Sequence, residues 1–323
     1  MADTLQWDSG VTFLPAQRAI DSRRIEHVFS VDVEEYFQVS AFEPFVDRAL
    51  WPRIPSRVGR SVDELLSLLA AHGATGTFFI LGCVAERHPA LVREIAGAGH
   101  EIASHGWSHR RVSSLTADAF SDELRRSKAL LEDIAGREVI GFRAPSFSIG
   151  LRDGWAFDAL VDAGYRYDSS IFPVRRPGYG DRSAPPTPFR IERERGALLE
   201  LPLATLGVLG MRLPAAGGGY LRHFPLGLIR AAIAAAEASG ESAMVYVHPW
   251  EIDVAQPRMR VSPLTRLRHY GGLHRTMPRL ERLLTEFRFT SAARRYDDTL
   301  RGQSPGVLIG RDAAAAPAVA ARR

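Results

Sequence analysis

Two histidines stand at a spacing that can bind a metal ion. The segment SHGWSH carries His105 and His109 four residues apart. This spacing places two imidazoles on one face of a helix, or lets a tight loop bring them together. Alone the pair is a weak signal, because ordinary surface or core histidines often occur at this spacing. With a carboxylate from another segment, the pair becomes a His₂-carboxylate set that leaves an open position on zinc or another divalent ion.

Three carboxylates follow an apolar run near the start of the chain. In SVDVEEYFQ, Asp32, Glu34 and Glu35 come just after Val28 and Phe29. If the strand continues, its side chains alternate, so that Asp32 and Glu34 point to one side and Glu35 to the other. One of the first two can bind the metal while the other acts as a general base toward water. The sequence leaves open which does which, and it indicates a solvent-facing or supporting role for Glu35.

An arginine and a third histidine extend this set. In FRAPSF, Arg143 precedes a rigid Ala-Pro step and can hold Asp32 ionised through paired N–H bonds. In VYVHPWE, His248 follows an apolar run and can donate a proton to a leaving amine. Each residue also has an ordinary interpretation, as an exposed arginine at a strand end and as a hydrogen-bonded core histidine.

The elements that must position these residues alternate between short apolar runs and helical patterns. Runs typical of strands occupy residues 28–31, 77–81, 100–104, 139–142, 165–170, 198–203 and 243–247. Helical patterns occupy residues 61–73, 89–99, 116–136, 153–164 and 226–240, with Ser61 and Glu64 as a capping box and Thr116 as another helix start. This alternation predicts a parallel sheet in one large α/β barrel rather than two domains. Residues 172–195, with five prolines, are predicted to form a long surface loop.

Polar residues stand where these predicted strands end. They are Asp32, Glu34, His105, Arg143, Asp168 and His248. Barrels of alternating strands and helices assemble their active sites from separate segments at this edge of the sheet. The carboxylates after the first strand are therefore predicted to form one wall of a reaction site.

Composition and charge narrow the class of protein. The chain has 323 residues, 46% hydrophobic and 24% charged, which is ordinary for a folded enzyme. Its 41 basic and 37 acidic residues give a net charge of only +4, spread along the chain, and we expect no nucleic-acid partner. Cys83 is the only cysteine, so no intrachain disulfide is expected. No secretion signal or membrane span is recognisable, and we therefore expect a cytoplasmic protein without a transmembrane segment.

The ordered segments SVDVEE, SHGWSH, FRAPS, YRYDSS and VYVH resemble the five motifs of the polysaccharide deacetylases, carbohydrate esterase family 4, with the nodulation-type deacetylase homology domain. Further along, HPWEID, QPR, RLRHYGGL and EFRFTSA, with GGGYLR at residues 217–222, resemble the subgroup found with bacterial exopolysaccharide (exosortase) loci. The resemblance implies a distorted (β/α) barrel that hydrolyses N-acetyl groups on an amino-sugar polysaccharide or its precursor. It also implies a divalent metal, Zn²⁺ first, with Co²⁺, Mn²⁺ or Fe²⁺ as alternatives.

The resemblance also implies a role for each matching residue. Asp32 matches the catalytic base, Arg143 the arginine that orients it, His248 the general acid, and Asp168 the carboxylate that tunes the acid. Glu34, His105 and His109 match the metal ligands, and a backbone N–H near Ser146 matches the oxyanion donor. The sequence departs from the family pattern at Asp32-Val33-Glu34, where two adjacent aspartates are usual, at Ser146, where tyrosine is usual, and at Tyr246, where leucine is usual. The usual tryptophan after Asp168 is also missing.

The predicted organisation has four parts. Residues 1–26 are an N-terminal arm, 27–250 the deacetylase barrel, 251–300 a C-terminal extension packed on the barrel, and 301–323 a flexible tail. The three glycines Gly217 to Gly219 are predicted to be a flexible rim loop, because no Gly-Lys-Ser/Thr follows for phosphate binding.

Several functional alternatives remain. A glycosidase would leave the histidine pair unexplained. A metal-dependent amidohydrolase of a small amide and a non-catalytic, metal-bearing sugar-binding subunit are the remaining candidates. The expected partner is an N-acetylated polysaccharide or a lipid-linked oligosaccharide, and a homo-oligomer is compatible with the sequence.

Overall fold

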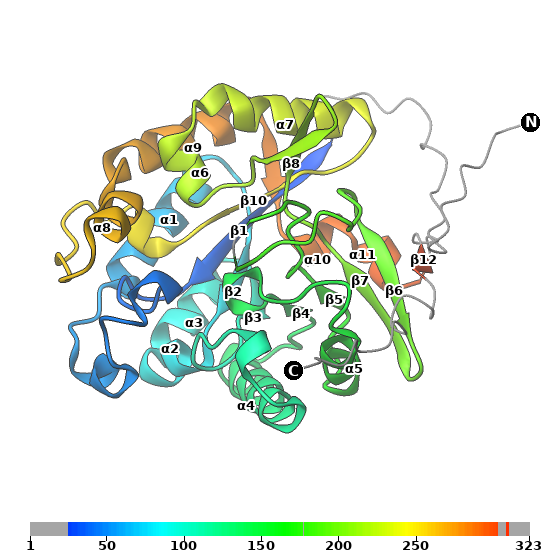
Figure 1. Ribbon diagram of the computed structural model, residues 1–323, viewed down its shortest axis with the longest axis horizontal. Coiled ribbons are helices and arrows are strands. Elements are labelled where there is room, and N and C mark those ends of the chain that lie inside the picture. The colour runs from blue at the N-terminus through cyan, green and yellow to red at the C-terminus, as the bar shows by residue number, and fades with distance from the viewer. Residues whose placement is uncertain (1–24, 177, 303–307, 310–323) are drawn as a thin grey trace, which may run out of the picture.

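The computed structural model describes residues 25–176, 178–302 and 308–309 (Figure 1). The predicted N-terminal arm falls outside these residues except for its last two positions. Most of the predicted tail also lies outside them. Within the tail, Leu308–Ile309 form a short strand, β12, paired with β6.

One curved sheet forms the centre of the molecule. Its strands are β1 (Glu26–Val33), β2 (Thr77–Ile80), β3 (Glu101–Ser104), β4 (Gly141–Phe142), β5 (Tyr167–Asp168), β6 (Phe189–Arg193), β7 (Gly196–Glu200), β10 (Met244–Val247), β11 (Arg288–Thr290) and β12. The order of nine of them is β10-β1-β2-β3-β4-β5-β7-β6-β12, the tenth, β11, pairs with β1, and every pairing is parallel except that of β6 with β7. Strands β1, β2 and β10 are buried almost throughout, as expected for a parallel sheet covered on both faces. Strands β6 and β12 run opposite to the other strands, which all present their carboxyl ends on the same side.

The barrel is distorted between β7 and β10. No ladder joins these two strands among the described residues. The connecting chain spans the gap instead: the Leu201 backbone N–H donates to the Asp168 carbonyl at 2.8 Å, and the Ala204 N–H donates to the Met244 carbonyl at 3.1 Å. The predicted distorted (β/α) barrel is thus confirmed.

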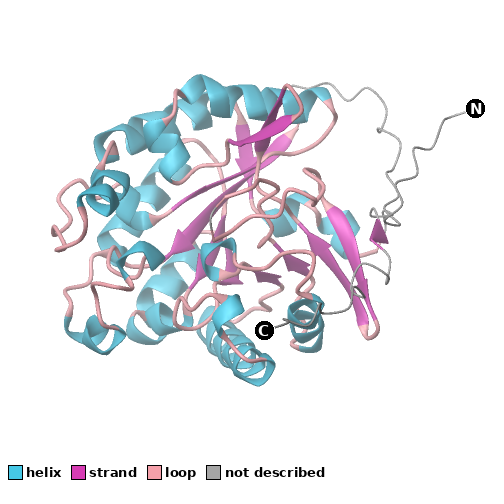
Figure 2. Cartoon of the chain, viewed as in Figure 1, coloured by secondary structure: helices cyan, strands magenta, loops and turns pink. Residues whose placement is uncertain are grey.

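Helices surround the sheet (Figure 2). They are α1 (Val58–Ala71), α2 (Gly82–Arg87), α3 (Pro89–Gly97), α4 (Ala117–Ala135), α5 (Gly154–Asp162), α6 (Gly219–His223), α7 (Leu226–Ala238), α8 (Pro263–Tyr270), α9 (Thr276–Glu286), α10 (Ala292–Arg295) and α11 (Asp297–Leu300). Helix α4 begins as predicted, with the Thr116 side chain accepting from the Ala119 N–H at 3.3 Å, and it ends at a left-handed Gly136. A separate hairpin, β8 (Thr205–Val208) and β9 (Met211–Pro214), projects from the body. No described helix is long and apolar enough to cross a membrane.

The predicted start of helix α1 is wrong. The helix begins at Val58, and Ser61 is buried inside it rather than capping it. The cap comes from Glu35, whose Oε2 accepts from the Arg57 backbone N–H at 3.0 Å. A carboxylate at this position satisfies free N–H groups and matches the positive end of the helix dipole. Glu35 is therefore buried and structural, not solvent-facing.

Two further predictions about chain segments need correction. The expected surface loop at 172–195 contains the strand β6, and Phe172, Val174 and Phe189 in it are buried. The C-terminal segment does more than pack on the barrel, because β11 pairs directly with Glu26–Val28 of β1.

A second apolar cluster joins the loop after β1 to the segment after β10. Its buried members are Tyr36, Phe37, Val39, Phe42, Val46, Trp250 and Leu273. The Phe42 ring lies 4.5 Å from the His269 ring of α8. This cluster fixes two long connections over the carboxyl ends of β1 and β10, where the site residues lie.

Candidate metal centre and catalytic groups

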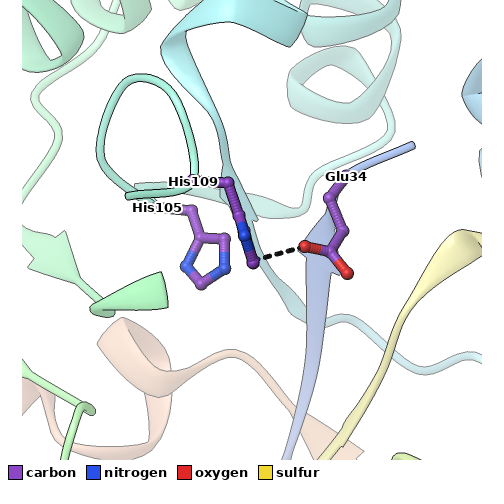
Figure 3. Close-up of side chains that lie close together, drawn as sticks. All are labelled: Glu34, His105 and His109. Atoms are coloured by element: carbon purple, nitrogen blue, oxygen red, sulfur yellow. Dashed lines mark ion pairs between the residues drawn. The ribbon is translucent and has the colours of Figure 1, made fainter. Parts of the chain in front are cut away.

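Glu34, His105 and His109 converge at the carboxyl end of the sheet (Figure 3). One ligand atom from each residue lies within 4.8 Å of the others, and all three side chains are buried. Oε2 of Glu34 is 2.6 Å from Nε2 of His109. The structure groups Glu34, and not Asp32, with the two imidazoles.

The backbone around His109 is held in an unusual conformation. Glu34 follows β1 and His105 follows β3, whereas His109 lies in the loop beyond, with a left-handed φ of 54°. The Arg48 guanidinium donates to the His109 carbonyl at 3.2 Å and also to the Ser108 carbonyl. Ser146 and Phe147, near the same site, also have positive φ, at 57° and 51°. Non-glycine residues in this region cost energy and are concentrated at functional sites.

Hydrogen bonds orient the candidate ligands. Nδ1 of His105 lies 2.8 Å from the Arg143 carbonyl, so it carries the proton and leaves Nε2 free. Burial lowers the pKa of His105 to about 4, which keeps the ring neutral. Trp250 Nε1 donates to Glu34 Oε1 at 2.9 Å. Burial alone would raise the pKa of Glu34, but His109 and His248 outweigh it and hold that pKa below its ordinary value.

These residues fit a divalent cation. Oε2 of Glu34 is buried and forms no regular hydrogen bond with the described residues, but it lies 2.6 Å from Nε2 of His109, so the two ligand atoms face the same point. Two imidazoles and one carboxylate are a donor set suited to zinc and similar ions, with room for a further ligand. Glu34, His105 and His109 would hold the ion, as the sequence predicts.

Asp32 lies beside this set, paired with a fully buried arginine. Nη1 of Arg143 donates to Asp32 Oδ1 at 2.6 Å and to Ser30 Oγ at 3.0 Å. The rest of the guanidinium donates to the carbonyl and hydroxyl of Ser169. Because each guanidinium nitrogen of Arg143 donates a hydrogen bond, the buried charge is compensated. Asp32 is held through Oδ1, and its Oδ2 forms no hydrogen bond with Arg143.

His248 faces both carboxylates. Its Nε2 is 3.9 Å from Asp32 Oδ2 and 3.7 Å from Glu34 Oε1, and 17% of its side chain is exposed. Its Nδ1 is 3.2 Å from Oε2 of Glu251. Burial lowers the pKa of His248, but Glu34, Glu251 and Asp32 outweigh burial and raise it to about 9. The ring is thus set to carry a proton at neutral pH.

Glu251 is a site residue that the sequence reasoning missed, and the contact of the buried Trp250 with Glu34 was missed as well. Glu251 is fully buried and its Oε1 accepts from Nε of Arg222 at 2.8 Å. Trp250 stacks on His248, with ring centroids 5.1 Å apart at 21°. A signal was present in HPWE, because an acidic residue three positions after a histidine can reach back to it over one tight turn.

The structure does not bring Asp168 to His248. Asp168 lies opposite Glu200 across β5 and β7, and both side chains are fully buried. Its Oδ1 accepts from the Ser170 hydroxyl at 2.5 Å. No hydrogen bond or ion pair joins Asp168 to His248, and the carboxylate at Nδ1 of that ring is Glu251. The tuning role predicted for Asp168 is therefore filled by Glu251.

Aromatic side chains line the space beside His248. The Tyr246 ring lies 5.4 Å from the His248 ring and 5.2 Å from the Phe147 ring. Ser146, whose backbone N–H was the predicted oxyanion donor, lies in the strained turn before Phe147, with its hydroxyl 2.6 Å from that of Ser40. The departures from the family pattern at Ser146 and Tyr246 thus lie close together, next to the proton donor.

The glycines at 217–219 pack closely rather than forming a loose rim. Gly217 bridges to Tyr246, and a Cβ on it would lie 1.9 Å from the Tyr246 carbonyl oxygen. A Cβ on Gly218 would lie 2.5 Å from the Tyr246 hydroxyl. Only glycine allows this approach, so the predicted flexible loop is wrong.

A cavity of about 550 Å³ lies beside the loop that carries His109, and its lining includes none of the metal candidates or proton-transfer residues. Trp51, Phe37, Arg48 and Ser108 are among its walls. Arg48 connects it to the site, because the same guanidinium holds the His109 carbonyl. The cavity is large enough to hold a sugar unit.

Comparison with known families now adds to this geometry. Residues 55–167 match the family "Polysaccharide deacetylase", and residues 169–297 match a "Domain of unknown function (DUF3473)". The resemblance to the polysaccharide deacetylases recognised in the motifs is therefore confirmed, whereas the resemblance to the exopolysaccharide subgroup stays a prediction.

Curated relatives have deacetylase names. The chain is 30% identical over 115 residues to a peptidoglycan deacetylase of Helicobacter pylori, covering 34% of this chain and 36% of that protein. It is 30% identical over 138 residues to a chitooligosaccharide deacetylase of Rhizobium leguminosarum bv. trifolii, covering 36% and 60%. The alignments thus span only part of these relatives.

Solved structures share the fold. A crystal structure described as a "putative polysaccharide deacetylase from Mycobacterium smegmatis" aligns with a TM-score of 0.59 at 21% identity, over 96% of this chain and 98% of that one. Puue allantoinase aligns with a TM-score of 0.56 at 17% identity, over 89% and 95%. At these identities the similarity establishes the fold.

Proposed function

We propose that this protein hydrolyses N-acetyl groups on an amino-sugar polysaccharide or its precursor, releasing acetate and a free amine. One arrangement supports the proposal. Asp32 is held by Arg143, and His248 is held by Glu251. The Asp32 and His248 side chains face each other beside the His₂-carboxylate set. A sugar-binding subunit would need the sugar pocket but neither Asp32 nor His248 in these positions.

The residues divide the proton transfers between them. A divalent ion at Glu34, His105 and His109 would supply Lewis acidity toward the amide oxygen and the attacking water. Asp32, held in place by Arg143, accepts a proton from water as it adds to the amide carbon. His248 then donates its Nε2 proton to the nitrogen as the C–N bond breaks. Glu251 holds the opposite ring nitrogen and so presents Nε2 to the reaction.

Acetate release from N-acetylglucosamine oligomers tests the proposal directly. The zinc- or cobalt-loaded protein should release acetate, whereas chelated protein and His105→Ala should not. His274→Ala is the matched control, because it removes an exposed histidine elsewhere. Absence of acetate release from folded, metal-loaded protein, on these oligomers and on peptidoglycan and acidic polysaccharides, would contradict it.

The finer assignments are part of the same proposal. We assign the substrate to exopolysaccharide biosynthesis because of the segments HPWEID, RLRHYGGL and EFRFTSA. We assign zinc as the ion. We assign the cytoplasm as the compartment, where a lipid-linked oligosaccharide would be accessible before export. A homo-oligomer is compatible with this assignment. Hydrolysis of a small amide is the competing activity, since an allantoinase shares the fold. The cavity beside the site favours the larger substrate, and rates on oligomers of increasing length separate the two.

A further inference from the structure

The segment after the catalytic histidine has an unusual charge distribution. Residues 254–280 contain six arginines and no aspartate or glutamate. Five of these arginines are exposed: Arg258, Arg260, Arg266, Arg268 and Arg275. None of the five forms an ion pair with a described carboxylate. This surface is therefore strongly cationic, although the whole chain is nearly neutral.

Exposed leucines lie among these arginines. Leu264 and Leu267, on helix α8, are 56% and 65% exposed, and Val254 nearby is 52% exposed. Leu264, Leu267 and Arg268 are spaced three and four residues apart, so they share one face of α8. The opposite face carries the buried His269. Large apolar side chains exposed next to unpaired arginines are characteristic of segments that lie in a membrane interface.

Helix α8 is directly connected to the proposed active site. The His269 ring stacks on Trp250, with centroids 4.2 Å apart at 16°, and Trp250 donates to Glu34. Gln256 holds both residues, through the His269 ring at 2.8 Å and the Trp250 carbonyl at 2.6 Å. Figure 1 shows α8 on the side of the molecule toward which β1 points, which is the side of the site residues.

We propose that α8 and the arginine-rich segment around it, residues 254–270, form a docking surface for an anionic lipid bilayer. The leucines enter the interface while the arginines contact lipid phosphates and carboxylates. Soluble acidic polysaccharide would attract the arginines equally but gives no reason to expose two leucines, so the bilayer is the favoured partner. Docking would hold the site close to the membrane surface.

Vesicle binding by the full chain tests this proposal without any substrate, so the result does not depend on the deacetylase assignment. The protein should co-sediment with phosphatidylcholine vesicles containing phosphatidylglycerol, and bind poorly to pure phosphatidylcholine or at high salt. Leu264→Ser with Leu267→Ser should weaken binding by at least tenfold. Arg266→Gln with Arg268→Gln should weaken it by roughly fivefold for each charge removed.

The hairpin offers a matched control. Leu209 and Met211 are 94% and 63% exposed, and in Figure 1 the β8–β9 hairpin lies away from α8. Leu209→Ser with Met211→Ser should leave vesicle binding unchanged, and all variants should keep the thermal unfolding temperature of the original protein. Failure to bind anionic vesicles would overturn the proposal. Loss of vesicle binding in the hairpin variant would also overturn it. So would a loss of vesicle binding in the arginine variant while the leucine variant still binds, because that result indicates a soluble polyanion as the partner.

Discussion

Oε2 of Glu251 lies 3.2 Å from Nδ1 of His248, while Oε1 of the same carboxylate is held by Arg222 at 2.8 Å. The resulting Arg222-Glu251-His248 chain resembles the orienting carboxylate of other general acid–base sites. It fixes which ring nitrogen points toward the reaction. It also provides a negative charge that favours the protonated ring.

Glu251→Gln should lower the pKa of His248. The His248 pKa is raised to about 9, with Glu251 among the charges that raise it, so loss of that charge makes the proton leave at lower pH. The basic limb of the kcat profile should then move down by about one pH unit or more. A cation at Glu34 would lower the His248 pKa in both proteins, so the comparison between them remains valid. Glu138→Gln, which removes an exposed pair with Arg166, is the control; an unmoved limb in Glu251→Gln would exclude this role.

Trp250→Phe should weaken metal binding while keeping the stack on His269. Phenylalanine lacks the Nε1–H that holds Glu34 Oε1 at 2.9 Å, so the carboxylate loses its fixed orientation. We expect the affinity for zinc, measured by competition with a chelating dye, to fall about 10- to 100-fold. Trp155→Phe changes a tryptophan packed on Phe120 and should leave the affinity unchanged. Equal affinities in the two variants would mean that the hydrogen bond does not support the site.

The sequence predicts those site residues whose positions follow from the pattern of a single strand or from the end of a strand. Alternation along β1 separates Asp32 and Glu34 from Glu35, and the ends of the parallel strands bring His105, Arg143 and His248 to the same edge. The barrel follows from the same alternation of strands and helices. These inferences succeed because each depends on residues within one or two elements.

The remainder depends on contacts between distant segments. The cap of α1 is Glu35, which comes from the loop after β1, so no pattern near Ser61 could indicate the correct start. Strand β6 was missed because prolines at 185, 186 and 188 precede it, although its antiparallel partner β7 follows immediately. The pairing of Asp168 with Glu200 comes from the register of β5 and β7, which the sequence does not give.

Asp168 and Glu200 should share one proton, and Glu200→Gln tests this. Asp168 Oδ2 and Glu200 Oε2 accept no hydrogen bond from other described groups. Burial raises the pKa of Asp168 to about 6, and burial with the Asp168 charge raises that of Glu200 well above its ordinary value. Both carboxyls have a higher pKa in the folded protein than in the unfolded chain. The protonated pair therefore stabilises the fold fully below about pH 4, and this stabilisation is lost as the pH rises through the pKa values of the folded protein.

Glutamine at 200 can donate an N–H to Asp168 without ionising. The free energy of unfolding of Glu200→Gln, from urea titrations, should therefore exceed that of the original protein by an amount that grows between about pH 5 and pH 9. Glu200→Ala lacks the donor and should lose about 3 kcal/mol at every pH. If the unfolding free energies of the glutamine variant and of the original protein change with pH in parallel, Asp168 and Glu200 do not share a proton.

Gly217→Ala should destabilise the protein and impair the site together. The residue has a φ of 141°, and an added Cβ would lie 1.9 Å from the Tyr246 carbonyl oxygen, so the chain beside β10 must move. Tyr246 lies two residues before His248, and the displacement would be transmitted to the proton donor. We expect a loss of about 3 kcal/mol or more in unfolding free energy, measured by urea titration. Gly227→Ala is the matched control, because nothing lies within 4 Å of its Cβ position in helix α7 and alanine should stabilise the helix by up to about 1 kcal/mol. Similar stabilities for the two variants would contradict the close packing of Gly217 against β10.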